Sequence, residues 1–177
     1  MLLWLKRLSL QRSAWLLLCF STLALEATAL YFQHGMGLQP CVMCIYERVA
    51  LIGITFASII GILLPTSMII RLIALFIGLG SAVKGLLLAL KHVDYQVNPS
   101  PWNQCAYLPE FPQSLPLDKW FPFMFNPTGS CSEITWEFLG ITMAQWIAVI
   151  FAFYLLLFVL LLISQLKPLK SNRYLFH

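Results

Sequence analysis

Four of the five cysteines give this sequence its clearest chemical signal. The five are Cys19, Cys41, Cys44, Cys105 and Cys131. Cys41 and Cys44 form a CxxC motif, the usual spacing of a dithiol that cycles between redox states. A disulfide in so small a ring removes little chain entropy, so its value as a structural crosslink is low. The motif therefore favours redox chemistry.

Cys105 and Cys131 are separated widely enough for either a structural or a redox role. Four cysteines allow three pairings, and Cys41–Cys44 with Cys105–Cys131 is the simplest because each pair is local to one loop. Closing the longer loop would stabilise the chain by roughly 3–4 kcal/mol, so a purely structural bond stays open. A zinc site usually combines two close pairs of ligands, and the second close pair is missing here, so we expect no metal.

The residues around Cys44 favour a reactive sulfur. Cys44 directly precedes an apolar run, which places it near a helix N-terminus, where the helix dipole favours a thiolate. Arg48 follows by four residues on the same helical face and adds a fixed positive charge, which Glu47 opposes in part. The sequence therefore predicts a stabilised Cys44 thiolate at the membrane boundary, where a lipid-soluble redox carrier could meet it. The alternative for Arg48 is a simple interfacial anchor.

Four apolar runs must position these cysteines. Of the 177 residues, 60% are hydrophobic and only 10% are charged, and the mean hydropathy is +0.82. The runs cover residues 14–32, 45–64, 72–90 and 144–164. Each is close to the ~20 residues with which a helix crosses a bilayer, and backbone groups in lipid must be satisfied within the segment. We therefore expect an all-α membrane protein, one integral domain over residues 1–177 built as a four-transmembrane-helix bundle.

The basic residues predict the orientation of these spans. Four spans place both tails and the connection after the second span on the same side of the membrane. These three segments carry the basic residues Lys6, Arg7, Arg12, Arg71, Lys167, Lys170 and Arg173. The positive-inside rule makes that side the cytoplasm, with both termini there. Loops 33–44 and 91–143 then face the oxidising space outside a bacterial inner membrane. A cleaved signal peptide ending near Ala29 is an alternative, but the apolar run continues to Phe32.

Two further expectations concern the second loop and the interior of the spans. The aromatic stretch Leu115–Phe125 favours a short helix on the membrane surface, capped by Asp118, or a loop packed over the bundle. Glu26 and Lys84 lie within spans, about 9 Å below the outer edge, so we expect them to pair or to share a polar network. Cys19 is expected to be a small buried apolar residue.

Longer strings of this sequence resemble the disulfide bond formation protein B (DsbB) family. They are Ala24-Leu-Glu-Ala-Thr-Ala-Leu-Tyr-Phe-Gln-His34, Pro40-Cys-Val-Met-Cys-Ile-Tyr-Glu-Arg48, the segments 95–105, 115–120 and 163–165, and Trp136-Glu-Phe-Leu-Gly140. The resemblance covers nearly the whole chain and includes all four loop cysteines. It implies a four-helix inner-membrane enzyme that reoxidises DsbA, a periplasmic dithiol protein, with a quinone (ubiquinone or menaquinone) as electron acceptor.

The resemblance also implies a role for each site residue. Cys105 forms the mixed disulfide with the partner and Cys131 is its pair, after which the electrons pass to Cys41 and Cys44. The quinone-binding residues are Cys44, Arg48, His92 and Glu47. Since thiolates attack disulfides through mixed intermediates, we further expect a transient Cys41–Cys131 bond.

Two other functions remain open on the sequence alone. The chain could be a disulfide-stapled membrane scaffold or assembly factor without turnover, or a small transporter that uses Glu26 and Lys84 as a polar pathway. The leading hypothesis is a protein-dithiol:quinone oxidoreductase whose partners are a DsbA-like protein, lipid and quinone. The net charge of +4 is small and scattered, so we expect no nucleic-acid partner.

Overall fold

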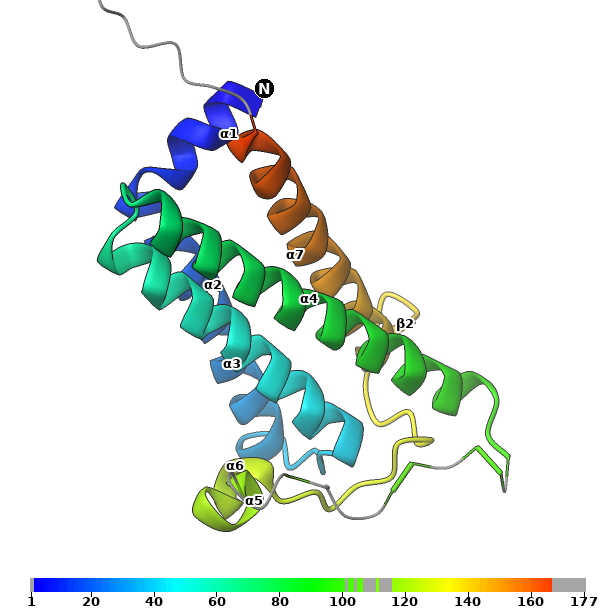
Figure 1. Cartoon of the computed structure of the whole chain (residues 1–177). Coiled ribbons are helices and arrows are strands. Elements are labelled where there is room, and N and C mark those ends of the chain that lie inside the picture. The colour runs from blue at the N-terminus through cyan, green and yellow to red at the C-terminus, as the bar shows by residue number, and fades with distance from the viewer. Residues whose placement is uncertain (1, 101, 104, 107–110, 112–115, 167–177) are drawn as a thin grey trace, which may run out of the picture.

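The computed structural model describes residues 2–100, 102–103, 105–106, 111 and 116–166, and four long helices form its body (Figure 1). They are α2 (Arg12–His34), α3 (Val42–Leu63), α4 (Met68–Val97) and α7 (Met143–Gln165). All four are long and apolar enough to cross a membrane. The prediction of an all-α bundle with four transmembrane helices is confirmed.

The helices extend beyond the apolar runs that revealed them. Helix α4 continues to Val97 rather than ending at residue 90, so His92 lies on a helix and not in a loop. Helix α3 begins at Val42 rather than at residue 45, which places Cys44 in its first turn. Hydropathy marks the stretch that suits lipid, whereas a helix continues for as long as its backbone hydrogen bonds do.

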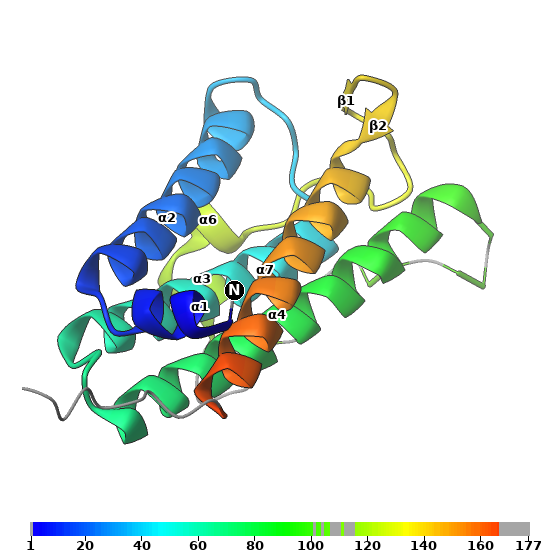
Figure 2. The ribbon, with the colours of Figure 1, turned by 90° about the horizontal axis from the view of Figure 1, so that it is seen from above.

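The helices pack in the order α2, α3, α4, α7, with the fully buried side chains of Ile54, Leu75 and Phe158 at the core. Small residues let α4 and α7 approach closely: a Cβ atom at Gly78 would overlap the ring of Phe158, and one at Gly85 would overlap Phe151. Such small-residue contacts are typical of helix packing in lipid. Seen from above, α2 and α7 stand apart on either side of α3 (Figure 2).

A short helix that the sequence analysis did not identify, α1 (Leu2–Ser9), closes the end of the bundle where α7 finishes (Figure 1). Lys6 Nζ donates to the backbone oxygen of Gln165, and Trp15 Nε1 donates to that of Ser9. Arg71 Nε donates to Oε1 of Gln165 over 3.0 Å. These bonds join α1, α2, α4 and α7 at the end opposite the loop cysteines.

The long connection before α7 contains two short helices and a hairpin. They are α5 (Leu117–Trp120), α6 (Pro122–Phe125), β1 (Glu137–Phe138) and β2 (Ile141–Thr142). Leu139 and Gly140 form the hairpin turn with positive φ angles of 56° and 74°. A short helix was expected here, but Asp118 lies inside its first turn and makes no cap, since Pro116 holds the N-cap position. Leu115 and the basic residues of the C-terminal tail lie outside the described residues.

The expected pairing of Glu26 with Lys84 is wrong. Glu26 is buried inside the bundle, whereas Lys84 is exposed on the outer surface of α4. The two were matched by depth, but depth alone does not fix the direction in which a helix presents a side chain. Cys19 is half-buried rather than fully buried.

Candidate functional site

All four loop cysteines meet at one end of the bundle. Cys105 and Cys131 form a disulfide. Cys41 and Cys44 are free thiols whose Sγ atoms lie 2.9 Å apart in a hydrogen bond. The structure therefore groups the cysteines into the two local pairs that the sequence favoured, one as a disulfide and one as a dithiol.

Cys41 occupies the N-cap position of α3. Its Sγ accepts the backbone N–H of Cys44 over 3.3 Å, as a serine or threonine oxygen does at other helix starts. The hydrogen bond from the Cys44 thiol lowers the pKa of Cys41, an effect that burial opposes. The sequence had predicted that Cys44 would receive this stabilisation. In the dithiol state the helix start favours Cys41 instead, because the free amide points back at the capping residue.

His92 and Glu47 form a buried pair beside the dithiol. His92, on α4, places Nε2 3.5 Å from Cys41 Sγ and Nδ1 3.1 Å from Glu47 Oε1. The side chains are 4% and 3% exposed, so the pair is shielded from water. With Nδ1 donating to the carboxylate, Nε2 of a neutral imidazole presents its lone pair to the thiol. His92 can therefore accept the proton of Cys41.

Arg48 ties three segments together beneath the dithiol. Its guanidinium donates to the backbone oxygen of Ala29 over 2.8 Å, to Gln33 Oε1 over 2.6 Å and to the backbone oxygen of Met124 over 2.9 Å. These acceptors belong to α2 and α6, whereas Arg48 itself belongs to α3. A planar guanidinium can serve three acceptors in different directions while keeping its charge.

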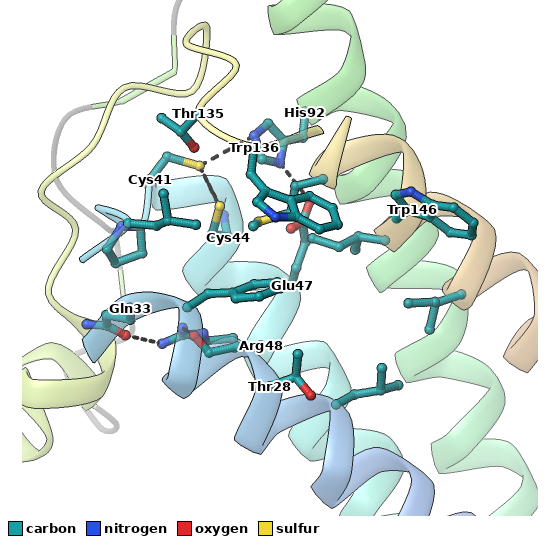
Figure 3. A pocket seen from close by; sticks show the side chains of 18 of the residues that line it. Thr28, Gln33, Cys41, Cys44, Glu47, Arg48, His92, Thr135, Trp136 and Trp146 are labelled. Carbon is teal, nitrogen blue, oxygen red and sulfur yellow. Dashed lines mark hydrogen bonds and ion pairs between the residues drawn. The ribbon is translucent and has the colours of Figure 1, made fainter. Parts of the chain in front are cut away.

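A cavity of about 430 Å³ opens next to these groups (Figure 3). It lies between α2, α3, α4 and α7, and its wall is largely apolar. The polar and sulfur-bearing side chains on it include Glu26, Cys44, Glu47, Arg48 and His92. Pockets for small organic ligands have this size and this sparse set of polar groups. The cavity fits a flat, mainly apolar ring with a few oxygen acceptors.

The carboxyl groups of Glu26 and Glu47 on the cavity wall have oxygens available to a ligand. Within the described part of the chain, both oxygens of Glu26 and Oε2 of Glu47 are buried without a hydrogen-bond partner. Buried polar atoms are almost always paired, so such exceptions need an explanation. A hydroxyl group of a bound molecule would donate to such an oxygen, and a protonated carboxyl group would donate to a carbonyl oxygen of that molecule.

The two cysteine pairs share one buried cluster. Cys41 and Cys131 belong to one buried cluster with Met43 and Tyr95, and Cys44 and Cys105 pack against it. The backbone N–H groups of Thr128 and Gly129 donate to the carbonyl oxygen of Pro40 over 3.0 and 3.1 Å. These bonds join the segment before Cys131 to the segment before Cys41.

Comparison with known proteins identifies the family. A family model described as "Disulfide bond formation protein DsbB" matches residues 11–161. Proteins named "Disulfide bond formation protein B" are similar over nearly their whole length. The one from Histophilus somni is 65% identical over 99% of both chains, and the one from Mannheimia succiniciproducens is 67% identical over 97% of both. The chain belongs to the DsbB family.

Membership confirms the resemblance drawn from the motifs and settles the class of activity. As a DsbB protein, the chain is a quinone-dependent disulfide oxidoreductase and a multi-pass inner-membrane protein. A disulfide-stapled scaffold without turnover is therefore not favoured. The structure gives this DsbB chain what such an enzyme requires, namely two adjacent sulfur pairs and a cavity beside one of them.

Sequence reasoning missed several residues of the DsbB site. Trp136 and Trp146 border the cavity, although the sequence analysis gave neither of them a role in the site (Figure 3). Gln33 holds Arg48 from the end of α2. Trp136 and Gln33 lie within the strings that resemble the family, and that resemblance could have identified them as site residues. Trp146 had no comparable signal.

Proposed function

We propose that electrons enter this DsbB chain at Cys105, cross from Cys131 to Cys41, and leave from the Cys41–Cys44 dithiol to a quinone in the cavity. The observation that carries this order is the presence of Cys131 and Cys41 in one buried cluster. Exchange between two disulfides needs such proximity, because a thiolate must reach the sulfur that it attacks.

Exposure supports Cys105 as the entry point. Cys131 is 2% exposed, whereas Cys105 is half-buried, and both line a second cavity of about 340 Å³ with Tyr95 and Asn103. A thiolate of a DsbA-type partner attacks Cys105 Sγ and forms a mixed disulfide. The Cys105–Cys131 bond breaks, and Cys131 leaves as a thiolate in the cluster that also holds Cys41.

The transfer between the pairs then follows from thiol–disulfide exchange. The Cys131 thiolate attacks Cys41 in the oxidised Cys41–Cys44 pair, which forms a Cys41–Cys131 bond and releases Cys44 as a thiolate. The partner's second thiol resolves its own mixed disulfide and frees Cys105. Cys105 then attacks Cys131, restores the first disulfide and releases Cys41. Two electrons have moved from the partner to the Cys41–Cys44 pair.

The residues around the cavity prepare the exit step. A bound quinone supplies an acceptor for two electrons and two protons. Cys44 and Arg48 both line the cavity, so the guanidinium supports negative charge that develops there. His92 lies within reach of the Cys41 proton, and Glu47 fixes the imidazole orientation. We assign Cys44, Arg48, His92 and Glu47 to quinone binding and reduction.

The distribution of charge supports the expected orientation. Lys6, Arg7, Arg12 and Arg71 all lie toward the end of the bundle opposite the loop cysteines. By the positive-inside rule this end, with the N-terminus and the last turn of α7, faces the cytoplasm. The cysteine end then faces the periplasm, where a soluble dithiol partner is available.

A reconstituted assay tests the relay. Purified protein is mixed with a reduced DsbA-type protein and a quinone, and quinone reduction is followed by absorbance. We expect turnover with the native chain, none with Cys44→Ser, and normal turnover with Cys19→Ser as the matched cysteine control. If the cysteines stay oxidised when the reduced partner is added, the relay is refuted.

A trapping experiment tests the order of transfer. The double variant Cys44→Ser, Cys105→Ser keeps only Cys41 and Cys131 among the four loop cysteines. We expect these two sulfurs to join in a single disulfide, detected by peptide mass mapping. The variant Cys41→Ser, Cys105→Ser leaves Cys44 with Cys131 and should form much less of a bond. Equal yields from both variants would contradict Cys41 as the receiving sulfur.

A further inference from the structure

We propose that Cys41, Cys44 and His92 form a binding site for one thiophilic divalent cation, Zn²⁺ or Cd²⁺, and that this site exists only while the pair is a dithiol. Two thiolates and an imidazole are the ligand set of a known class of zinc site with three protein ligands. All three ligand atoms lie within 4.8 Å of one another. Binding does not depend on the proposed relay; only its effect on turnover rests on that function.

The distances suit a tetrahedral ion with one small adjustment. Zn–S bonds of about 2.3 Å and Zn–N bonds of about 2.0–2.1 Å give tetrahedral edges of about 3.6 Å for S···N and 3.8 Å for S···S. The Cys41 Sγ–His92 Nε2 distance is already 3.5 Å. The two sulfurs lie 2.9 Å apart, so one of them must move by about 0.9 Å. A rotation of the half-buried Cys44 side chain provides that movement.

Glu47 completes the arrangement as an orienting group. It accepts a hydrogen bond from Nδ1 of His92, which leaves Nε2 as the free donor atom toward the sulfurs. Metal-binding histidines nearly always donate their other ring N–H to a carboxylate or carbonyl in this way. Oε2 of Glu47 makes no hydrogen bond in the described part of the chain, so the His92 contact is the one that this carboxyl group serves there.

The redox state of the pair controls the site. Binding releases both thiol protons and forms two metal–sulfur bonds and one metal–nitrogen bond, without oxidation or reduction. Oxidation to the Cys41–Cys44 disulfide removes both thiolate donors and abolishes the site. Conversely, a bound ion occupies the sulfur electron pairs that would pass to the acceptor. The cation therefore acts as a reversible inhibitor that captures only the reduced enzyme.

Cadmium titration tests the binding directly. The Cys105→Ser, Cys131→Ser variant in detergent, reduced and free of oxygen, is titrated with Cd²⁺ while thiolate-to-cadmium absorption is recorded. We expect one equivalent to bind to the dithiol and none after oxidation of Cys41–Cys44. Adding Cys19→Ala to this variant should leave the stoichiometry unchanged. Equal binding to the oxidised form, or loss of binding with Cys19→Ala, would overturn the proposal.

A second set of measurements tests the histidine ligand and its orienting partner. With ¹¹³Cd and ¹⁵N-labelled histidine, nuclear magnetic resonance should show one imidazole nitrogen coupled to the metal. Glu47→Gln should weaken Cd²⁺ binding by about 10–100-fold, the usual cost of losing an orienting partner. His34→Ala, which alters an exposed histidine at the end of α2, is the matched control and should change nothing. Absence of the nitrogen coupling would refute the site.

The consequence for turnover is measured separately. Zn²⁺ should inhibit quinone reduction by the native chain, and a chelator should restore it. If turnover is absent without metal, the relay fails while Cd²⁺ binding can still be observed. If turnover is normal and Zn²⁺ at concentrations that fill the site does not slow it, the inhibitory role is refuted.

Discussion

The backbone N–H of Gly129 donates to the carbonyl oxygen of Pro40 over 3.1 Å. Cys131 follows two residues after this glycine, and Cys41 follows directly after the proline, so this bond holds the two sulfur pairs together. A Cβ atom at Gly129 would overlap the backbone oxygen of Gln39. The approach of the two loops therefore requires a residue without a side chain at this position.

Gly129→Val should uncouple the two pairs. The overlap with Gln39 must be relieved by a shift of one loop, at a cost of roughly 1–3 kcal/mol as for other overpacked sites. We expect quinone reduction by the reduced partner to fall about 10-fold, since each 1.4 kcal/mol is a factor of ten. The mixed disulfide between the partner and Cys105 should still form at its normal rate, which gel analysis after acid quenching measures.

Gly80→Ala provides the control for this substitution. Nothing lies within 4 Å of a Cβ atom at Gly80, which is exposed on α4, so turnover should match that of the native chain. If Gly129→Val keeps full turnover, the proposed contact between the loops is not needed for transfer.

The sequence predicted the helices well because their signal is long and local. A span needs about 20 apolar residues, and each run supplies them without help from distant residues. Helix α1 was not predicted because its eight residues are too few to cross a membrane. It instead closes one end of the bundle. The polar end of α4 was assigned to a loop for a related reason, since hydropathy falls before the helix ends.

The site was predicted only as far as its signals were local in sequence. CxxC and the nearby Arg48 could be found by spacing, but Glu47 and His92 are 45 residues apart on different helices. Their hydrogen bond depends on how α3 and α4 pack, which no short pattern encodes. The error over Glu26 has the same origin, because its partner was chosen by depth without knowledge of which way either side chain points.

Arg48→Lys should weaken quinone use more than it impairs transfer between the cysteine pairs. A lysine carries one compact charge and cannot serve Ala29, Gln33 and Met124 together. Hydrogen bonds to charged groups contribute roughly 1.5–3 kcal/mol each, so α6 should also loosen. We expect the KM for quinone to rise about 10-fold, which corresponds to 1.4 kcal/mol. The yield of the trapped Cys41–Cys131 bond should stay unchanged.

Cys41 should lose its proton at a lower pH than an ordinary thiol does. The hydrogen bond from Cys44 lowers the pKa of Cys41 and so stabilises its thiolate. Thiolate forms as pH rises through the pKa, so a lowered pKa moves the transition to lower pH. In a variant that retains only Cys41 and Cys44, ultraviolet absorbance of the thiolate follows the titration. Cys44→Ala removes the donor and should move the Cys41 transition to higher pH; a shift to lower pH would contradict this account.

Glu26→Gln tests whether the unpaired carboxyl of α2 serves the ligand rather than the fold. Its oxygens have no hydrogen-bond partner within the described residues, so an amide of the same size should leave thermal stability in detergent unchanged or higher. Because Glu26 lines the cavity with Cys44 and Arg48, the substitution should weaken quinone binding, measured by quenching of tryptophan fluorescence. Lys84→Gln, on the outer surface of α4, should alter neither property. A Glu26→Gln protein that melts earlier but binds quinone normally would show that the carboxyl supports the fold instead.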